Sequence, residues 1–124
     1  MTRPPIYIAA PYPLKDEALL LRRSLLVAGH PVVSRWLDEQ DENSARTARL
    51  CLDDVDAAAI VVALNPPQWA NSGTGGRHVE LGYALAKGKR VVVIGARTNV
   101  FHFHLDIEHA DTVAAALKLV GEPS

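Results

Sequence analysis

The residues best suited to chemistry lie in a glycine-rich stretch, Ser72 to Gly76, and four residues beyond it, at Glu80. Glycine adopts backbone conformations that other residues avoid, so this stretch, followed by an Ala/Leu-rich segment, predicts a loop that leads into a helix. Free N–H groups and the positive dipole at a helix start favour an anion such as a phosphate. Glu80 would lie one turn inside the helix, beside that anion. A carboxylate in this position suggests a nucleophile or base held next to a bound sugar phosphate.

Each part of this stretch also has a simpler interpretation. The glycines are not followed by Gly-Lys-Ser/Thr, so the loop is no P-loop and can be an ordinary connection. The alternative is that Ser72, Thr74 and the backbone of Gly75 and Gly76 contact a phosphate or a 5'-hydroxyl. Glu80 can be a solvated helix carboxylate, although the residues one turn further on provide no lysine or arginine as an ion-pair partner.

The elements that would position these residues follow from the spacing of apolar side chains. Short apolar or β-branched runs predict strands, and consecutive apolar residues suit a parallel sheet covered on both faces. Segments with apolar residues at helical spacing, bounded by glycine or by capping polar residues, predict helices. The predicted strands are 6–10, 32–36, 57–64, 90–95 and a short fifth at 105–109, and the predicted helices are 15–28, 45–56, the Ala/Leu segment that Gly88 ends, and 113–120, with Asn43 or Ser44 and Asp111 as caps.

The alternation of these elements predicts an α/β fold, a flavodoxin-like doubly wound parallel sheet of about five strands. The 124 residues suffice for one hydrophobic core, so residues 1–124 are interpreted as a single domain. Ligands of such sheets bind beyond the carboxyl ends of the strands. That edge would collect residues 9–13, Arg35 and Trp36, residues 65–76, and residues 96–102.

Composition and charge exclude several classes of protein. The 13 basic and 14 acidic residues form no block of one sign, so we expect neither a nucleic-acid nor a membrane surface. No apolar run approaches the roughly 20 residues of a membrane span, and the first residues lead directly into a strand instead of a signal peptide. The single cysteine, Cys51, excludes an internal disulfide and fits a reducing compartment. We therefore expect a cytoplasmic protein.

Two segments of the chain are informative when they are considered jointly. They are Ile6-Tyr7-Ile8-Ala9-Ala10-Pro11 and Gly75-Gly76-Arg77-His78-Val79-Glu80-Leu81-Gly82-Tyr83-Ala84-Leu85-Ala86. They resemble the nucleoside 2-deoxyribosyltransferase family, which includes 2'-deoxynucleoside 5'-phosphate N-hydrolases, and Glu-Leu-Gly-Tyr-Ala is the specific part. The resemblance covers nearly the whole chain in the same order of elements. It implies a flavodoxin-like fold, homodimers or higher oligomers with sites near subunit contacts, and a glutamate nucleophile at Glu80. No cofactor is expected.

The implied chemistry is cleavage of the N-glycosidic bond of a nucleoside or nucleoside 5'-monophosphate. A carboxylate below the sugar C1' can stabilise the oxocarbenium-like state or form a glycosyl-enzyme ester. Water or a second base then takes the sugar, and the leaving base needs a proton, usually from a second acidic group. Hydrolysis of a monophosphate is favoured over base exchange, because Arg35, Arg77 and the Ser/Thr/Gly loop offer anion partners.

The sequence departs from the family pattern where that second acid is expected. Family aspartates fall on Cys51 and on Ala59, so the partner acid has to be another residue. Asp54 is the first candidate and Asp53 the second, although a shift of one residue on a helix turns a side chain by about 100°. The family's glycine two places before the nucleophile is His78, which could donate to a substrate or reshape the loop.

Several other residues at the expected ligand edge have two interpretations. Tyr7 can be core or can bring its hydroxyl to the nucleophile, and Ala10 follows it at the strand end. Trp36 and Trp69 can stack a nucleobase, or can serve packing or a subunit contact. Asn99 could reach the site of a neighbouring subunit, as an asparagine does in the transferases.

Two residue types invite chemistry that we do not predict. His102, His104 and His109 suggest a metal, but no acidic or cysteine partner stands at ligand spacing. Cys51 is interpreted as a small buried side chain instead of a nucleophile.

The sequence therefore predicts an enzyme of nucleoside or nucleotide metabolism, with a small molecule as its partner. The alternative is a non-catalytic nucleotide-binding module that senses or sequesters its ligand, because Cys51 and Ala59 stand at expected acid positions. A purely structural subunit is disfavoured by the glycine-rich loop and the exposed functional edge.

Overall fold

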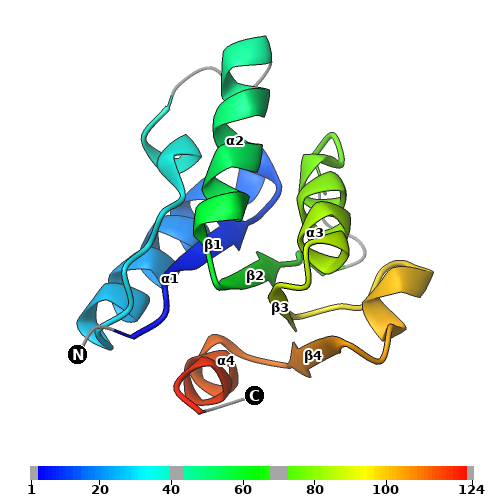
Figure 1. Ribbon diagram of the computed structural model, residues 1–124. Coiled ribbons are helices and arrows are strands. Elements are labelled where there is room, and N and C mark those ends of the chain that lie inside the picture. Colours follow the sequence, from blue (N-terminus) through cyan, green and yellow to red (C-terminus); the bar gives the residue numbers. More distant parts are fainter. Residues whose placement is uncertain (1–2, 40–43, 68–72, 123–124) are drawn as a thin grey trace.

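The computed structural model describes residues 3–39, 44–67 and 73–122, and these residues form an α/β fold built on one parallel sheet (Figure 1). The strands lie side by side in chain order, and Tyr7 pairs with Val61, which pairs with Val91. The sheet separates α2 and α3, which pack against each other on one face, from α1 and α4 on the other. The elements are β1 (Ile6–Ala9), α1 (Lys15–Val27), α2 (Ala45–Ala57), β2 (Ile60–Leu64), α3 (Gly76–Ala86), β3 (Arg90–Ile94), β4 (Ile107–Ala110) and α4 (Val113–Val120).

The core consists of the sheet and the helix faces that cover it. All residues of β1 and β2 are buried, as are the four apolar residues of β3. Helices on both faces leave no strand face for water, which explains why these strands are continuously apolar and β-branched. The flavodoxin-like α/β architecture predicted from the sequence is thus confirmed.

The strand predicted at residues 32–36 is wrong. Val32 makes one parallel bridge to Ile6, at the outer edge of β1, and the chain then turns into a 3₁₀ helix at Arg35–Asp38. Two side chains replace the missing ladder: the Ile8 N–H donates to the Ser34 hydroxyl (2.6 Å), and the Trp36 indole donates to the Ile8 carbonyl (2.8 Å). These hydrogen bonds satisfy the edge of β1, so no further strand residues are needed there.

Several predicted boundaries shift by a few residues. Helix α2 begins as predicted, because the Ser44 hydroxyl accepts from the Thr47 N–H (3.1 Å), but it continues to Ala57 and delays the start of β2 to Ile60. The cap of α4 is Thr112 instead of Asp111, with its hydroxyl accepting from the Ala115 N–H (3.1 Å). Strand β4 begins two residues later than predicted, and a 3₁₀ helix, Val100–Phe103, interrupts the loop before it. Within the described residues, no helix has the length and apolar character required to cross a membrane.

Candidate active site

The glycine loop packs against the segment that leaves β1, at the carboxyl edge of the sheet. Gly73 has a φ of 71°, and a Cβ there would lie 3.1 Å from the Pro11 Cβ, closer than neighbouring atoms normally approach. Gly75 caps α3 with a φ of 92°, in the left-handed region that favours glycine. These two glycines allow α3 to start directly above the end of β1. The helix then carries Glu80 over that strand.

Glu80 contacts Tyr7, which lies in β1 with no exposed surface. The Tyr7 hydroxyl donates to Oε2 of Glu80. Burial raises the pKa of the Glu80 carboxyl to about 7, against the opposing effect of hydrogen bonds from Tyr7 and Cys51. Burial, followed by the charge of Glu80, also raises the pKa of Tyr7 well above its usual range. The phenol therefore stays protonated and acts as a fixed donor to the carboxylate.

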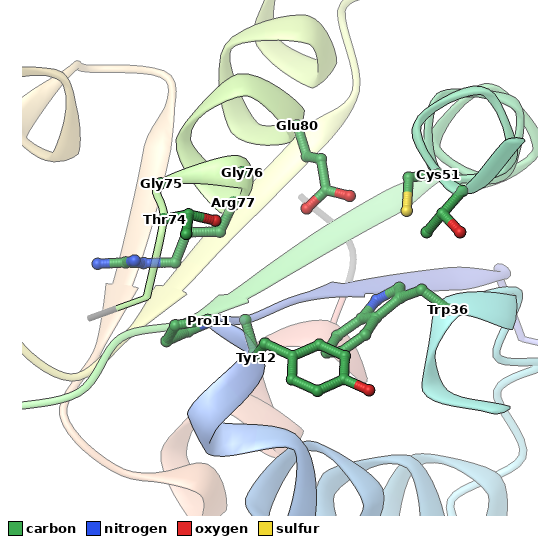
Figure 2. A pocket seen from close by; sticks show the side chains of 11 residues that line it. Pro11, Tyr12, Trp36, Cys51, Thr74, Gly75, Gly76, Arg77 and Glu80 are labelled. Atoms are coloured by element: carbon green, nitrogen blue, oxygen red, sulfur yellow. The ribbon is translucent and has the colours of Figure 1, made fainter. Parts of the chain in front are cut away.

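Cys51 faces Glu80 from the opposite side. Figure 2 shows the side chains of Glu80 on α3 and Cys51 on α2 projecting side by side into the space between the helices. Burial raises the pKa of the Cys51 thiol to about 11, although its hydrogen bond with Tyr7 acts in the other direction. The thiol is thus a neutral donor, and the carboxyl of Glu80 is the group of these three that changes charge near neutral pH.

A groove runs along this carboxylate. It consists of two hollows that share Thr47, Cys51, residues 74–76 and Glu80. Because Glu80 lines both hollows, a ligand can extend to either side of the carboxylate. One hollow continues to Ala10, Pro11, Tyr12, Trp36 and Arg77, and the other to Ser44, Ala45, Ala48, Leu52 and Val79.

Two aromatic rings close the first hollow. Tyr12 and Trp36 have ring centroids 6.4 Å apart at an angle of 43°, and both lie at the end of the groove below Cys51 in Figure 2. Trp36 is 7% exposed, and its hydrogen bond to the Ile8 carbonyl holds this ring in place. A planar heterocycle is the kind of group that such a wall can contact.

The structure brings together most, but not all, of the residues predicted for the site. Tyr7 contacts Glu80, and five further predicted residues line the groove beside Glu80. Ser72, Trp69 and Asn43 lie outside the described residues. The predicted residues that line the groove with Glu80 are Ala10, Trp36, Thr74, Gly75 and Gly76.

Asp54, the first candidate for the partner acid, is directed elsewhere. It is 4% exposed, and its carboxylate accepts from the Arg35 backbone (2.9 Å) and from the Arg35 Nε (2.8 Å). Neither of these residues lines the groove. Three helical positions leave the two side chains about 60° apart around the helix axis, and Asp54 lies on the side of α2 nearer the 3₁₀ helix while Cys51 lies on the side nearer Glu80. Asp53 is exposed on α2, and Ala59 is exposed at the amino end of β2, the opposite edge of the sheet.

His78 and Asn99 belong to a polar network behind the start of α3. Asn99 accepts from the Phe101 N–H through Oδ1 (2.9 Å), which directs its amide nitrogen to donate to Nδ1 of His78 (3.2 Å). The ring of His102, 2% exposed, lies tilted beside the His78 ring and accepts from the Thr98 N–H (2.9 Å). Burial lowers the pKa of both histidines, so these rings are neutral. Neither His78 nor Asn99 lines the groove.

The same network holds Arg77. This side chain is 4% exposed, and its Nε donates to Oδ1 of Asn65 (2.9 Å). The Asn65 amide in turn donates to the Ala96 carbonyl (2.8 Å). Figure 2 shows the guanidinium of Arg77 extending away from Glu80, so the stem of the side chain, instead of its charge, borders the groove.

Sequence reasoning missed Thr47, the role of Cys51, and the residues of the second hollow, which are Ser44, Ala45, Ala48, Leu52 and Val79. A signal for the first was present, since Thr47 and Cys51 are four apart and share one face of α2. Tyr12 lies in the ligand edge predicted at residues 9–13, although the sequence assigned it no role of its own. In the described part of the chain, no group of three or more His, Cys, Asp or Glu side chains could hold a metal ion.

Fold and groove together define a flavodoxin-like α/β protein with a half-buried, titratable carboxyl at the carboxyl edge of its sheet. Solved structures with a similar fold include the CMP N-glycosidase BcmB of Clostridium botulinum, with a TM-score of 0.64, 16% identity, and coverage of 94% of this chain and 98% of that chain. A 2-deoxyribosyltransferase from Leishmania mexicana has a TM-score of 0.63, 23% identity, and coverage of 98% and 99%.

A 3-dehydroquinate dehydratase-like protein from Bifidobacterium longum is less similar, with a TM-score of 0.52, 11% identity, and coverage of 98% and 94%. No model of a known protein family matches the sequence, and no curated protein does. At these identities the likeness concerns the fold, which is the fold that the family resemblance of the sequence implies.

Proposed function

We propose that this protein cleaves the N-glycosidic bond of a nucleoside or nucleoside 5'-monophosphate, with Glu80 as the nucleophile. The observation that carries the proposal is the position of Glu80, in the middle of a groove and in contact with Tyr7 and Cys51. The names of two structural neighbours, a CMP N-glycosidase and a 2-deoxyribosyltransferase, support the same class of reaction.

The geometry suits a reaction through an oxocarbenium-like state. A sugar placed over Glu80 would have its C1' next to a carboxylate whose negative charge is little screened by water. Positive charge that develops at C1' is then stabilised, or the carboxylate forms an ester with that carbon. Tyr7 holds the carboxylate in one orientation through its hydroxyl, so Glu80 loses little freedom when the sugar binds.

The two ends of the substrate have different surroundings in the groove. The base would lie against Tyr12 and Trp36, and the 5' end would lie near Thr74 and the first N–H groups of α3. A 5'-phosphate would then lie at the glycine loop instead of at an arginine, because Arg35 is engaged by Asp54 and the guanidinium of Arg77 extends away. The two arginines on which the sequence analysis based hydrolysis therefore do not support it, and we propose hydrolysis, with water taking the sugar from Glu80, on the name of the CMP N-glycosidase neighbour.

The test is a chromatographic screen of the purified protein with the common nucleosides and their 5'-monophosphates, each with and without a second free base. We expect release of free base, and we expect Glu80→Gln to lower kcat at least about a thousandfold while ligand binding persists. Glu17→Gln, on the exposed first turn of α1, is the matched control and should change neither. Unchanged turnover in Glu80→Gln would disprove the role of Glu80, and incorporation of the added base would assign transfer instead of hydrolysis.

A second candidate function follows from one observation. The α2 residue that faces Glu80 is a thiol with a raised pKa, where the proposed reaction of a neutral base would use an acid. The groove could then bind a nucleotide without cleaving it. Recovery of intact ligand from a tight complex after long incubation would support this binding module, and release of free base would exclude it.

A further inference from the structure

The proton donors around Glu80 determine which bases can leave when an N-glycosidic bond is cleaved in the groove. Among the described residues that line the groove, Glu80 is the one carboxylic acid. Asp54 has its carboxylate bonded to Arg35 and does not line the groove. The α2 side chain that faces Glu80 is Cys51, whose thiol has a pKa raised to about 11. A thiol of this kind is a poor proton donor at neutral pH.

Tyr7 and Glu80 cannot act as the acid either, because Tyr7 keeps its proton and Glu80 has to be ionised. The hydroxyl of Tyr7 donates to Glu80, and burial raises its pKa far above neutrality. Glu80 itself has to be ionised to stabilise a positive C1', so it cannot also deliver the proton to the leaving base. The groove thus has a well-placed carboxylate for the sugar and, among the described residues, no matched acid for the base.

The need for an acid depends on the charge of the base. When the C1'–N bond of an ordinary nucleoside breaks, both electrons remain on the ring nitrogen, and the base leaves as an anion unless it is protonated. When the base is a cation, the same electron pair cancels its positive charge. Such a base leaves neutral and needs no proton, so general acid catalysis contributes nothing to its departure.

We propose that the site in this groove cleaves N-glycosides with a positively charged base in preference to those with a neutral base. Examples of such substrates are N-alkylated purine or pyrimidine nucleosides and pyridinium nucleosides. This inference rests on the proposed function, since it names the substrate class of the same site. In the reaction, the C1'–N bond breaks as an oxygen of Glu80 bonds to C1', and the base leaves neutral. Water then attacks C1', the ester bond breaks, and one proton passes to solvent.

The charge of Glu80 favours the same class, because the carboxylate lies half-buried at the middle of the groove and attracts a cation. The aromatic rings add little to this preference, since Trp36 is 7% exposed and the Lys15 ammonium already lies 5.1 Å from the centroid of the Tyr12 ring. The two nearby arginines do not oppose a cation in the groove. Arg35 is paired with Asp54 (2.8 Å), and the guanidinium of Arg77 is directed toward Asn65, away from Glu80.

Matched pairs of nucleosides that differ by one methyl group and one charge test the proposal. The pairs are guanosine and 7-methylguanosine, cytidine and 3-methylcytidine, and adenosine and 1-methyladenosine, as ribosides and 2'-deoxyribosides with and without a 5'-phosphate. Each kcat/KM is divided by the uncatalysed rate of the same compound, because cationic nucleosides are intrinsically more labile. We expect this ratio to be at least about a hundredfold higher for the cationic member of the pair that binds, the usual contribution of a general acid.

Variants of Cys51 provide the second arm. Cys51→Asp places a carboxylic acid opposite Glu80 and should raise the efficiency on the neutral nucleoside, relative to its cationic partner, by about a hundredfold or more. Cys51→Asn has the same shape without the acid and should leave that relative efficiency as in the wild type. Thermal unfolding of both variants shows whether the fold tolerates the change.

Three outcomes are informative. A cationic preference that Cys51→Asp reduces and Cys51→Asn keeps supports the proposal. Equal enhancement of neutral and cationic nucleosides by the wild type, abolished by Glu80→Gln, overturns the substrate class while the proposed cleavage stands. Failure to cleave any member of the pairs, or cleavage that survives Glu80→Gln, overturns both, because the role of Glu80 itself is then wrong.

Discussion

At the residue scale, the chemistry depends on one carboxyl group, that of Glu80, whose pKa lies near neutral pH. Burial disfavours the charged form of Glu80, and the hydroxyl of Tyr7 partly restores it. With a pKa of about 7, the carboxylate is available as a nucleophile only at neutral pH and above. Small changes in its surroundings will therefore move the pH range of activity.

The first prediction concerns this pH range. We expect kcat/KM to rise with pH and level off above about 7, since Glu80 has to be ionised. In Tyr7→Phe the carboxylate loses a donor that stabilises its charge, so the acid limb should move to higher pH by roughly one unit. A pH–rate profile of both proteins measures the shift. A limb that moves to lower pH in Tyr7→Phe would contradict the role assigned to this hydroxyl.

The second prediction concerns stability at the same residue. The folded-state pKa of Glu80, about 7, lies above the ordinary value of 4.5, so the stabilisation from neutral Glu80 is complete below pH 4.5 and is lost as the pH rises to about 7. Glu80→Gln should therefore raise the free energy of unfolding at pH 8 by about 2 kcal/mol more than at pH 4.5. Urea unfolding at both pH values tests this, with Glu17→Gln as a control that shows no such pH-dependent gain.

At the element scale, the start of α3 determines where Glu80 lies. Its cap, Gly75, has a φ of 92°, and a Cβ there would meet only His78 at 4.0 Å, so the cost of a side chain would be conformational. Gly82 in the same helix has open space around its Cβ position. Alanine substitutions at these two glycines therefore separate the effect of backbone conformation from that of side-chain contact.

The third prediction uses this pair. Gly75→Ala should lower the free energy of unfolding by about 1–2 kcal/mol, because alanine is strained in the left-handed region. Gly82→Ala should raise it by roughly 0.5–1 kcal/mol, because alanine is the better helix former. Denaturant unfolding of both variants gives the two signs. Equal destabilisation by both substitutions would contradict the assigned conformation of Gly75.

The same scale shows how side chains can end a predicted strand. The run from Val32 to Trp36 has the apolar and β-branched character of a strand, and Val32 does pair beside β1. After it, the Ser34 hydroxyl and the Trp36 indole satisfy the backbone of Ile8. These contacts depend on groups far apart in the sequence, so local pattern could not have predicted them.

At the scale of the whole molecule, one surface stands out by its composition. The segment between β3 and β4 exposes four large apolar side chains within six residues, with exposed fractions from 61% to 99%. Such a concentration is typical of a surface that another protein covers. The family resemblance of the sequence implies homo-oligomers, so we infer that a second copy of this chain covers it. The four residues are Val100, Phe101, Phe103 and Leu105.

The fourth prediction follows from this surface. Light scattering of the wild type at micromolar concentration should give at least twice the mass of one chain, 13.4 kDa, and the double variant Phe101→Ser, Leu105→Ser should shift it toward the monomer. Val27→Ser is the control and should leave the mass unchanged, because Val27 is 83% exposed at the end of α1, a helix that Figure 1 shows on the opposite side of the molecule from the segment between β3 and β4. A monomeric wild type would contradict the inference.

The sequence by itself determined the order of the helices and most strands, because the spacing of apolar residues, the glycines and the capping residues are local properties of the chain. It also determined that Glu80 follows a glycine loop by one helical turn. The tertiary structure decided which side chain of α2 meets that carboxylate. The rotation of α2 about its axis depends on packing against the sheet and α3, and it turns Cys51 toward Glu80 and Asp54 toward Arg35. No local pattern contains that rotation, since it is set by contacts between residues distant in the chain.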